Sequence, residues 1–149
     1  MYIMKNYFFY FFIASLSILT SCSSDSDKSD VNYIKAKING VDLKFNIISV
    51  DIEDYTEYKD IIISATMESD PTKSIIIASQ YDVTGEGEIW RCSHYSGSDY
   101  YEIQNADTFI SNITKNSSGN YEATFSGNLI NMNDDSVITL TNGSMKIKY

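Results

Sequence analysis

One stretch of the sequence concentrates the residue types best suited to recognition. Residues 90–101 contain the only tryptophan, the only arginine, the only histidine and three tyrosines. Aromatic faces stack on sugar rings or anchor protein contacts, and a guanidinium adds a fork of hydrogen-bond donors. A competing interpretation makes Trp90 a core residue and the tyrosines ordinary strand residues, which β-sheets favour. If this stretch forms a binding face, the residues that carry it are Trp90, Arg91, Tyr95, Tyr100 and Tyr101.

Cys92 and His94 raise the question of nucleophilic catalysis, because a thiol beside an imidazole is one of its recurring pairs. Two residues apart on a predicted strand, they share one face. No third orienting group and no G-x-S-x-G elbow accompanies them. The simpler interpretation is a small buried thiol beside a half-exposed imidazole at the strand end. One histidine and one free thiol also cannot complete a tetrahedral zinc site without carboxylates. We therefore expect no enzyme, no cofactor and no zinc site.

Five carboxylates lie between residues 51 and 60, and calcium requires six to eight oxygen ligands. Their spacing does not match an EF-hand loop, and no glycine supplies its sharp turn. A solvated connection between two strands explains the same run of acids. Acid pairs also serve glycoside hydrolysis, although nothing in the sequence brings one pair together at a cleft. We assign no metal ligands and leave calcium open for Asp51, Glu53, Asp54, Glu57 and Asp60.

The elements that must position these residues are strands. From residue 33 onward, short runs rich in Ile, Val, Tyr and Thr alternate with turn residues, with only one proline and no helical apolar period. The pattern predicts an all-β fold, an antiparallel β-sandwich or open barrel of about nine short strands. Strands are expected near 33–38, 41–45, 47–52, 60–67, 74–80, 88–93, 99–103, 107–114, 121–130, 137–141 and 144–149.

Asn-Gly occurs twice between alternating segments, and it is the strongest short hairpin signal because a type I′ turn needs positive φ at both positions. Asn39-Gly40 separates the first two expected strands, and Asn142-Gly143 separates the last two. The sequence therefore predicts one hairpin at each end of the domain.

The amino-terminal residues have the form of a secretory signal. Lys5 precedes an apolar run from Tyr7 to Leu19. As a helix this run would span about 20 Å, short of the ~30 Å hydrocarbon core, which disfavours a permanent transmembrane helix. The following Leu-Thr-Ser-Cys resembles the lipobox of bacterial lipoproteins, which implies cleavage before Cys22 and acylation of that cysteine. Acyl chains then hold the mature chain on a membrane.

Three parts follow from this organisation: a signal peptide at 1–21, a lipidated cysteine with an acidic tether at 22–30, and a single β domain at 31–149. The tether has no apolar side chain from Ser23 to Asp30 and is expected to be disordered. The formal net charge is −9, and loss of the signal peptide removes one more lysine. Such an acidic chain repels phosphate backbones, so we expect no nucleic-acid partner.

Both ends of the β domain resemble a family. The segments 37–45, 122–129 and 138–147 are similar to those of uncharacterised small lipoproteins of Bacteroidota, domains of unknown function. Those proteins open with I-N-G and an aromatic residue and close with G-T-F-S-G and I-T-N-G motifs. Ala123 and Met145 stand here where that pattern has a glycine and an aromatic residue. The resemblance implies an all-β domain on the outer membrane, facing the periplasm or the cell surface, and it carries no catalytic residues.

These observations favour a non-enzymatic, membrane-anchored envelope lipoprotein whose β domain binds a glycan or an envelope protein. The alternative is a structural or accessory component of an envelope complex, without ligand affinity of its own. In both cases the lipid anchor makes the membrane a partner.

Overall fold

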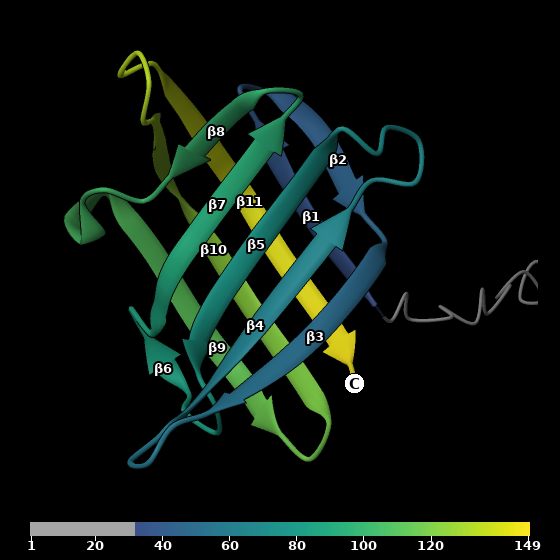
Figure 1. The fold of residues 1–149 in the computed structure, drawn as a ribbon, viewed down its shortest axis with the longest axis vertical. Coiled ribbons are helices and arrows are strands. Elements are labelled where there is room, and N and C mark those ends of the chain that lie inside the picture. The colour runs from purple at the N-terminus through teal and green to yellow at the C-terminus, as the bar shows by residue number, and fades with distance from the viewer. Residues whose placement is uncertain (1–31) are drawn as a thin grey trace, which may run out of the picture.

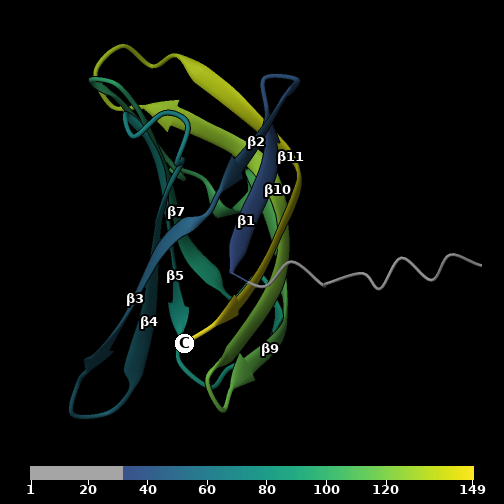
Figure 2. The same cartoon turned by 90° about the vertical axis from the view of Figure 1, so that its right-hand side faces the viewer.

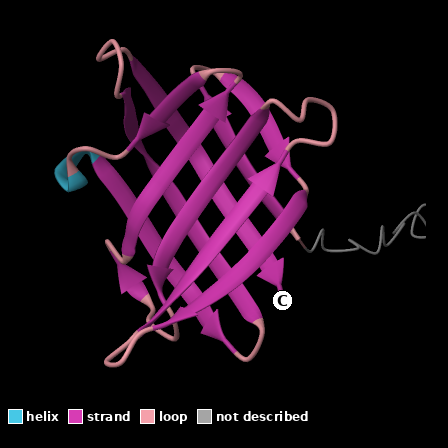
Figure 3. Cartoon of the chain, in the orientation of Figure 1, coloured by secondary structure: helices cyan, strands magenta, loops and turns pink. Residues whose placement is uncertain are grey.

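The computed structural model describes residues 32–149, which form an all-β fold, a single antiparallel sheet curled into a half-barrel (Figures 1 and 3). The predicted fold class is confirmed. Cys22, the signal peptide and the tether lie outside the described residues. Within 32–149 no helix has the length and apolarity to cross a membrane.

The elements are β1 (Tyr33–Ile38), β2 (Val41–Phe45), β3 (Ile47–Asp54), β4 (Lys59–Thr66), β5 (Lys73–Gln80), β6 (Gly85–Glu86), β7 (Ile89–Ser96), β8 (Asp99–Glu102), the short 3-10 helix η1 (Ala106–Thr108), β9 (Phe109–Ser117), β10 (Asn120–Asn131) and β11 (Val137–Lys148).

The strand order is β2-β1-β11-β10-β8-β7-β5-β4-β3, with β9 paired to β10 and β6 to β9. Seen from the side, the curled sheet makes two facing layers, with β3, β4, β5 and β7 in one and β1, β9, β10 and β11 in the other (Figure 2). The strands of the two layers cross steeply (Figure 1).

Asn46 alone joins β2 to β3, the two ends of the strand order. Its amide Nδ2 donates to Glu68 Oε2 at 2.8 Å, and the Glu68 N–H donates back to Asn46 Oδ1 at 3.2 Å. The Asn46 backbone N–H donates to the Thr66 carbonyl at 3.2 Å. These bonds fix the corner at which the chain passes from one layer to the other.

The core lies between the layers because successive side chains of a strand point to opposite faces. Both layers contribute fully buried apolar residues, each worth about 1.5–3 kcal/mol of transfer free energy. Tyr121 is the largest of them, and its hydroxyl lies 3.1 Å from Ser79 Oγ across the core. The other large, fully buried apolar side chains are Ile34, Phe45, Ile61, Ile63, Ile75, Ile77, Ile113, Leu129, Leu140 and Ile147.

The two Asn-Gly pairs behave differently. Asn39 and Gly40 have φ of 48° and 83° and close the β1–β2 hairpin, as predicted. The hairpin predicted at Asn142-Gly143 is wrong, because β11 runs through this pair as one strand. Asn142 keeps its positive φ of 53°, and the register of β11 against both β10 and β1 shifts there. The left-handed residue therefore makes a β-bulge between continuous partner strands.

Candidate functional site

Four of the five predicted binding residues share the outer face of β7 and β8. In the β7–β8 register, Tyr95 pairs with Tyr100 and His94 with Tyr101. Trp90, Arg91, Tyr95 and Tyr100 therefore point away from the core, whereas Tyr101 points to the inner side and stacks near His94 at 6.5 Å between ring centroids. The structure does not bring Tyr101 together with the other four.

Trp90 is 53% exposed, so the interpretation of this residue as part of the core is wrong. The cause is a bulge in β7. Ala78 of β5 pairs with Arg91 and the next residue, Ser79, pairs with Ile89, which leaves Trp90 as the extra residue. A bulge re-aims a side chain that simple alternation would place elsewhere.

A depression of about 430 Å³ lies beside the Trp90 ring, at the end of the front layer that carries the β3–β4 hairpin (Figure 1). Its lining comes from the start of β4, the end of β5 and the start of β7. Asp60 and Gln80 are direct cross-strand partners, so their side chains share the outward face. We call this set the Trp90 site, and it consists of Tyr58, Asp60, Gln80 and Trp90.

The aromatic side of the site continues into the β3–β4 loop. The Tyr55 ring stacks on Tyr58 with 4.9 Å between centroids, and the Tyr55 N–H donates to the Tyr58 carbonyl at 2.9 Å. Tyr55 is 44% exposed and Tyr58 is 47% exposed. Three aromatic rings from two segments thus lie at one end of the outer face.

Asp60 gives the site its charge. Asp60 is only 8% exposed, and within residues 32–149 its carboxylate has neither a hydrogen bond nor an ion pair. Its cross-strand partner on β3 is another carboxylate, Glu53. The Tyr55 hydroxyl donates to Glu53 Oε2 at 2.5 Å, and this bond, with smaller contributions from desolvation and both carboxylates, raises the pKa of Tyr55 to about 12. Lys59 pairs with Asp54 at 2.5 Å, on the other face of the hairpin.

Farther along β7, the outward side chains form hydrogen bonds and ring contacts with one another and with those of β8. Arg91 Nε donates to Ser93 Oγ at 3.3 Å, and the Tyr100 hydroxyl donates to Glu102 Oε2 at 2.5 Å. The Tyr95 and Tyr100 rings lie 4.7 Å apart between centroids. Five residues of extended chain separate Tyr95 from Trp90, a distance on the order of 15 Å. The tyrosine pair is therefore a separate patch, outside the Trp90 site.

Cys92 and His94 face the core. They share one face of β7, as predicted, but His94 is 3% exposed and the half-exposed imidazole predicted from the sequence is wrong. His94 Nδ1 lies 2.9 Å from the Ser74 carbonyl, and its ring lies edge-on to Phe45. Complete burial raises the pKa of the Cys92 thiol, the opposite of what activates a nucleophile. A small cavity of about 250 Å³ at the end of the half-barrel reaches His94.

The stability of the domain should depend on the charge of His94. Burial, helped by Lys73, lowers the pKa of His94 below 6.5 despite the Ser74 carbonyl. The unfolded chain then binds a proton that the folded chain resists, so the free energy of unfolding falls as pH drops from about 7 to 5, by at most about 1.4 kcal/mol per pH unit. Urea unfolding at several pH values measures this slope, and His94→Gln should flatten it. Asp70 and Asp134 have pKa values lowered from 3.8, so their protonation changes the free energy of unfolding only at pH values below this range. Equal slopes in both proteins would contradict the assignment.

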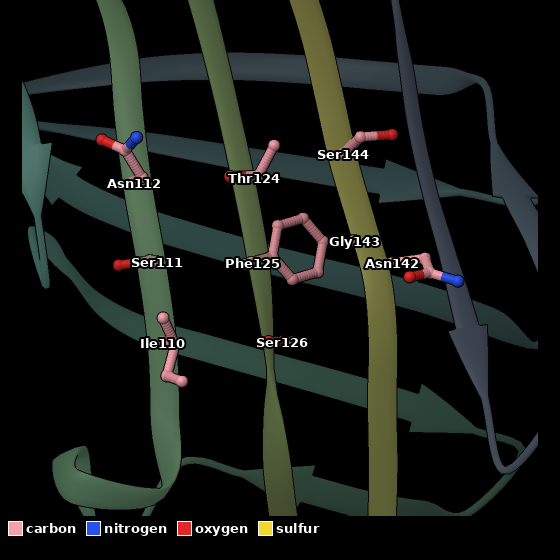
Figure 4. A pocket seen from close by; sticks show the side chains of 9 residues that line it. All are labelled: Ile110, Ser111, Asn112, Thr124, Phe125, Ser126, Asn142, Gly143 and Ser144. Carbon is pink, nitrogen blue, oxygen red and sulfur yellow. The ribbon is translucent and has the colours of Figure 1, made fainter.

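A second depression, of about 410 Å³, lies on the outer face of β9, β10 and β11. Asn112, Thr124 and Ser144 lie on three adjacent strands, and the Phe125 ring lies against Gly143 (Figure 4). None of its nine lining residues is charged, and the Phe125 ring is only 3% exposed. Hydroxyl and amide groups without an open ring or a charge make it a weaker recognition site than the Trp90 site.

The acidic run does not gather into a metal site. Within residues 32–149 no three His, Cys, Asp or Glu side chains lie close enough together to hold a metal ion. Alternation along β3 and β4 sends Asp54 and Lys59 to one face and Glu53 and Asp60 to the other.

The sequence analysis missed Tyr58 and Gln80 and recognised Asp60 only as one of five acids. Alternation extended back from the predicted strand would place Tyr58 on the same face as Asp60, but only the strand order brings both residues to Trp90. Comparisons of the chain with models of protein families, with curated proteins and with solved structures find no match.

Proposed function

We propose that this β domain binds a glycan through the Trp90 site and is held at the bacterial envelope by a lipid on Cys22. The observation that carries the proposal is an exposed tryptophan, Trp90, beside Asp60, a residue only 8% exposed whose carboxylate has no partner among the described residues. A pyranose ring has an apolar C–H face that packs on an aromatic ring and hydroxyls that bond to carboxylate and amide groups. Trp90 offers the first surface, and Asp60 and Gln80 offer the second.

The size of the depression also supports a small polar ligand. About 430 Å³ falls within the range of ligand sites, and the lining combines rings with few polar groups, as such sites do.

The proposed location rests on the sequence alone. The Leu-Thr-Ser-Cys motif ending at Cys22 supports acylation, and the Ser/Asp segment to Asp30 supports a tether that lets the domain reach ligands beyond the membrane. The domain is then a non-enzymatic binding module in this proposal; the buried thiol of Cys92 argues against thiol catalysis in particular.

Trp90→Ala should weaken glycan binding at least tenfold, because loss of the ring removes the stacking surface. Titration of the purified domain, residues 31–149, with ligands first identified on a glycan array measures the change. Val137→Ala is the control, since Val137 at the start of β11 is 53% exposed, as Trp90 is, and lines neither of the two depressions; it should bind like the wild type. Wild-type affinity in Trp90→Ala, or an array with no ligand, would contradict the proposal.

A further inference from the structure

Asp60 points to a more specific ligand. Building on the proposed function, we propose that the Trp90 site recognises a sugar with a free, unacetylated amino group, whose ammonium lies on the Asp60 carboxylate. The sugar ring lies on Trp90, and Gln80 bonds a neighbouring hydroxyl. The argument rests on the charges around Asp60 and on the rings that face it.

No residue in the described range 32–149 compensates the negative charge of Asp60 in the site. Glu53 and Asp60 lie directly opposite each other on β3 and β4, an arrangement that destabilises a sheet when both are charged. The Tyr55 hydroxyl donates its hydrogen bond to Glu53, and the Lys59 ammonium forms its ion pair with Asp54. Gln80, the cross-strand neighbour of Asp60, has no charge. Asp60, a residue only 8% exposed, thus has no hydrogen-bond or ion-pair partner among residues 32–149, and its carboxylate opens onto the depression that it lines. A cation bound there would be attracted by both carboxylates.

The rings favour the same kind of ligand. An ammonium group is attracted to the face of Trp or Tyr, and Trp90 and Tyr58 both line the site. A charge-assisted hydrogen bond to a partly buried carboxylate is about twice as strong as a neutral one. Uronic acids would be repelled by Asp60, and N-acetylated sugars would offer it no charge. The site therefore selects an amino sugar over its neutral and acidic counterparts.

The experiment uses oligosaccharides that share one β-1,4 pyranose backbone. Glucosamine, N-acetylglucosamine and glucose oligomers of equal length are titrated calorimetrically into the domain at pH 6, where the amine is protonated. We expect the glucosamine oligomer to bind about tenfold more tightly than the other two. Asp60→Asn should bring the ratio of the Kd values close to one, and Trp90→Ala should weaken binding of all three. Thermal unfolding of each variant checks that it is folded.

A remote acid separates specific recognition from general attraction to an acidic protein. Asp107→Asn removes one exposed negative charge in η1, and it should keep the wild-type preference. A preference lost equally in Asp107→Asn and Asp60→Asn would overturn the inference. Equal binding of the three oligomers by the wild type would overturn it too, while leaving glycan binding in place. If none of the three oligomers binds and the array shows no other glycan bound, the proposed function itself would be contradicted.

Discussion

Replacement of Gly127 by alanine should lower the free energy of unfolding by about 3 kcal/mol or more, which is about 10 °C in Tm for a domain of this size. A Cβ at Gly127 would lie 2.4 Å from the Thr108 carbonyl oxygen and 2.7 Å from Phe109 Cα. Both are backbone atoms that a rotamer change cannot move. The φ of +154° adds a conformation that L-residues rarely adopt. Urea unfolding of the variant beside the wild type measures the loss.

Two other glycines separate the causes. Gly97 has a φ of +64° and open space around its α-carbon, so Gly97→Ala reports the conformational cost alone, about 1 kcal/mol. Gly143 has no positive φ, but its Cβ would lie 2.4 Å from the Phe125 carbonyl oxygen and 2.5 Å from the Phe125 ring. Gly143→Ala therefore reports the steric cost alone. If Gly127→Ala costs no more than Gly97→Ala, the close approach of β9 and β10 is not limiting.

Asn116→Asp should be the second severe change, with a loss of about 3–5 kcal/mol at pH 7. Asn116 is 1% exposed, and its Nδ2 donates to the carbonyls of Gln80 and Val83 at 2.8 and 3.0 Å. A carboxylate would place negative charge against both oxygens without any donor. Burial would raise the pKa of the new carboxyl above its unfolded value, so the loss should grow as pH rises from about 4 to 7. Chemical unfolding at both pH values measures it.

Asn120→Asp is the matched control, because Asn120 also donates from Nδ2 to a backbone carbonyl, that of Ser118 at 2.8 Å, but near the surface. Water can solvate the new carboxylate there, so the loss should stay below about 1 kcal/mol and change little with pH. Similar losses in both variants would show that Asn116 is not held in a dry environment. Because Asn116 fixes the chain directly after Gln80, its loss should also loosen the Trp90 site.

The sequence predicted the strands well because alternation and turn residues are local signals. It failed at Asn142-Gly143, where Asn142 has the positive φ of a hairpin residue but lies between partner strands that both continue past it. Which of the two outcomes occurs is decided by β10 and β1, residues distant in the chain. The local preference of Asn-Gly restricts the backbone φ at Asn142, but it does not determine which strand pairs with this segment.

The candidate site was predictable in part for the same reason. The aromatic stretch was recognised, but the direction of Trp90 depends on a bulge that is visible only in the β5–β7 register. Asp60 was one of five acids, and its isolation follows from the pairing of Asp54 with Lys59 and of Glu53 with Tyr55. Tertiary neighbours, and not residue type, make one carboxylate different from the next.

The position of β11 between β1 and β10 sets the order in which the domain can be completed. A ribosome delivers a polypeptide from its amino end, so β1 and β2 emerge early and β11 is the last of the eleven described strands to arrive. Until then the early pair is an isolated hairpin, which is marginal in water. The β1–β2 pair can therefore join the rest of the sheet only when residues 137–148 have emerged and β11 has paired with both β1 and β10.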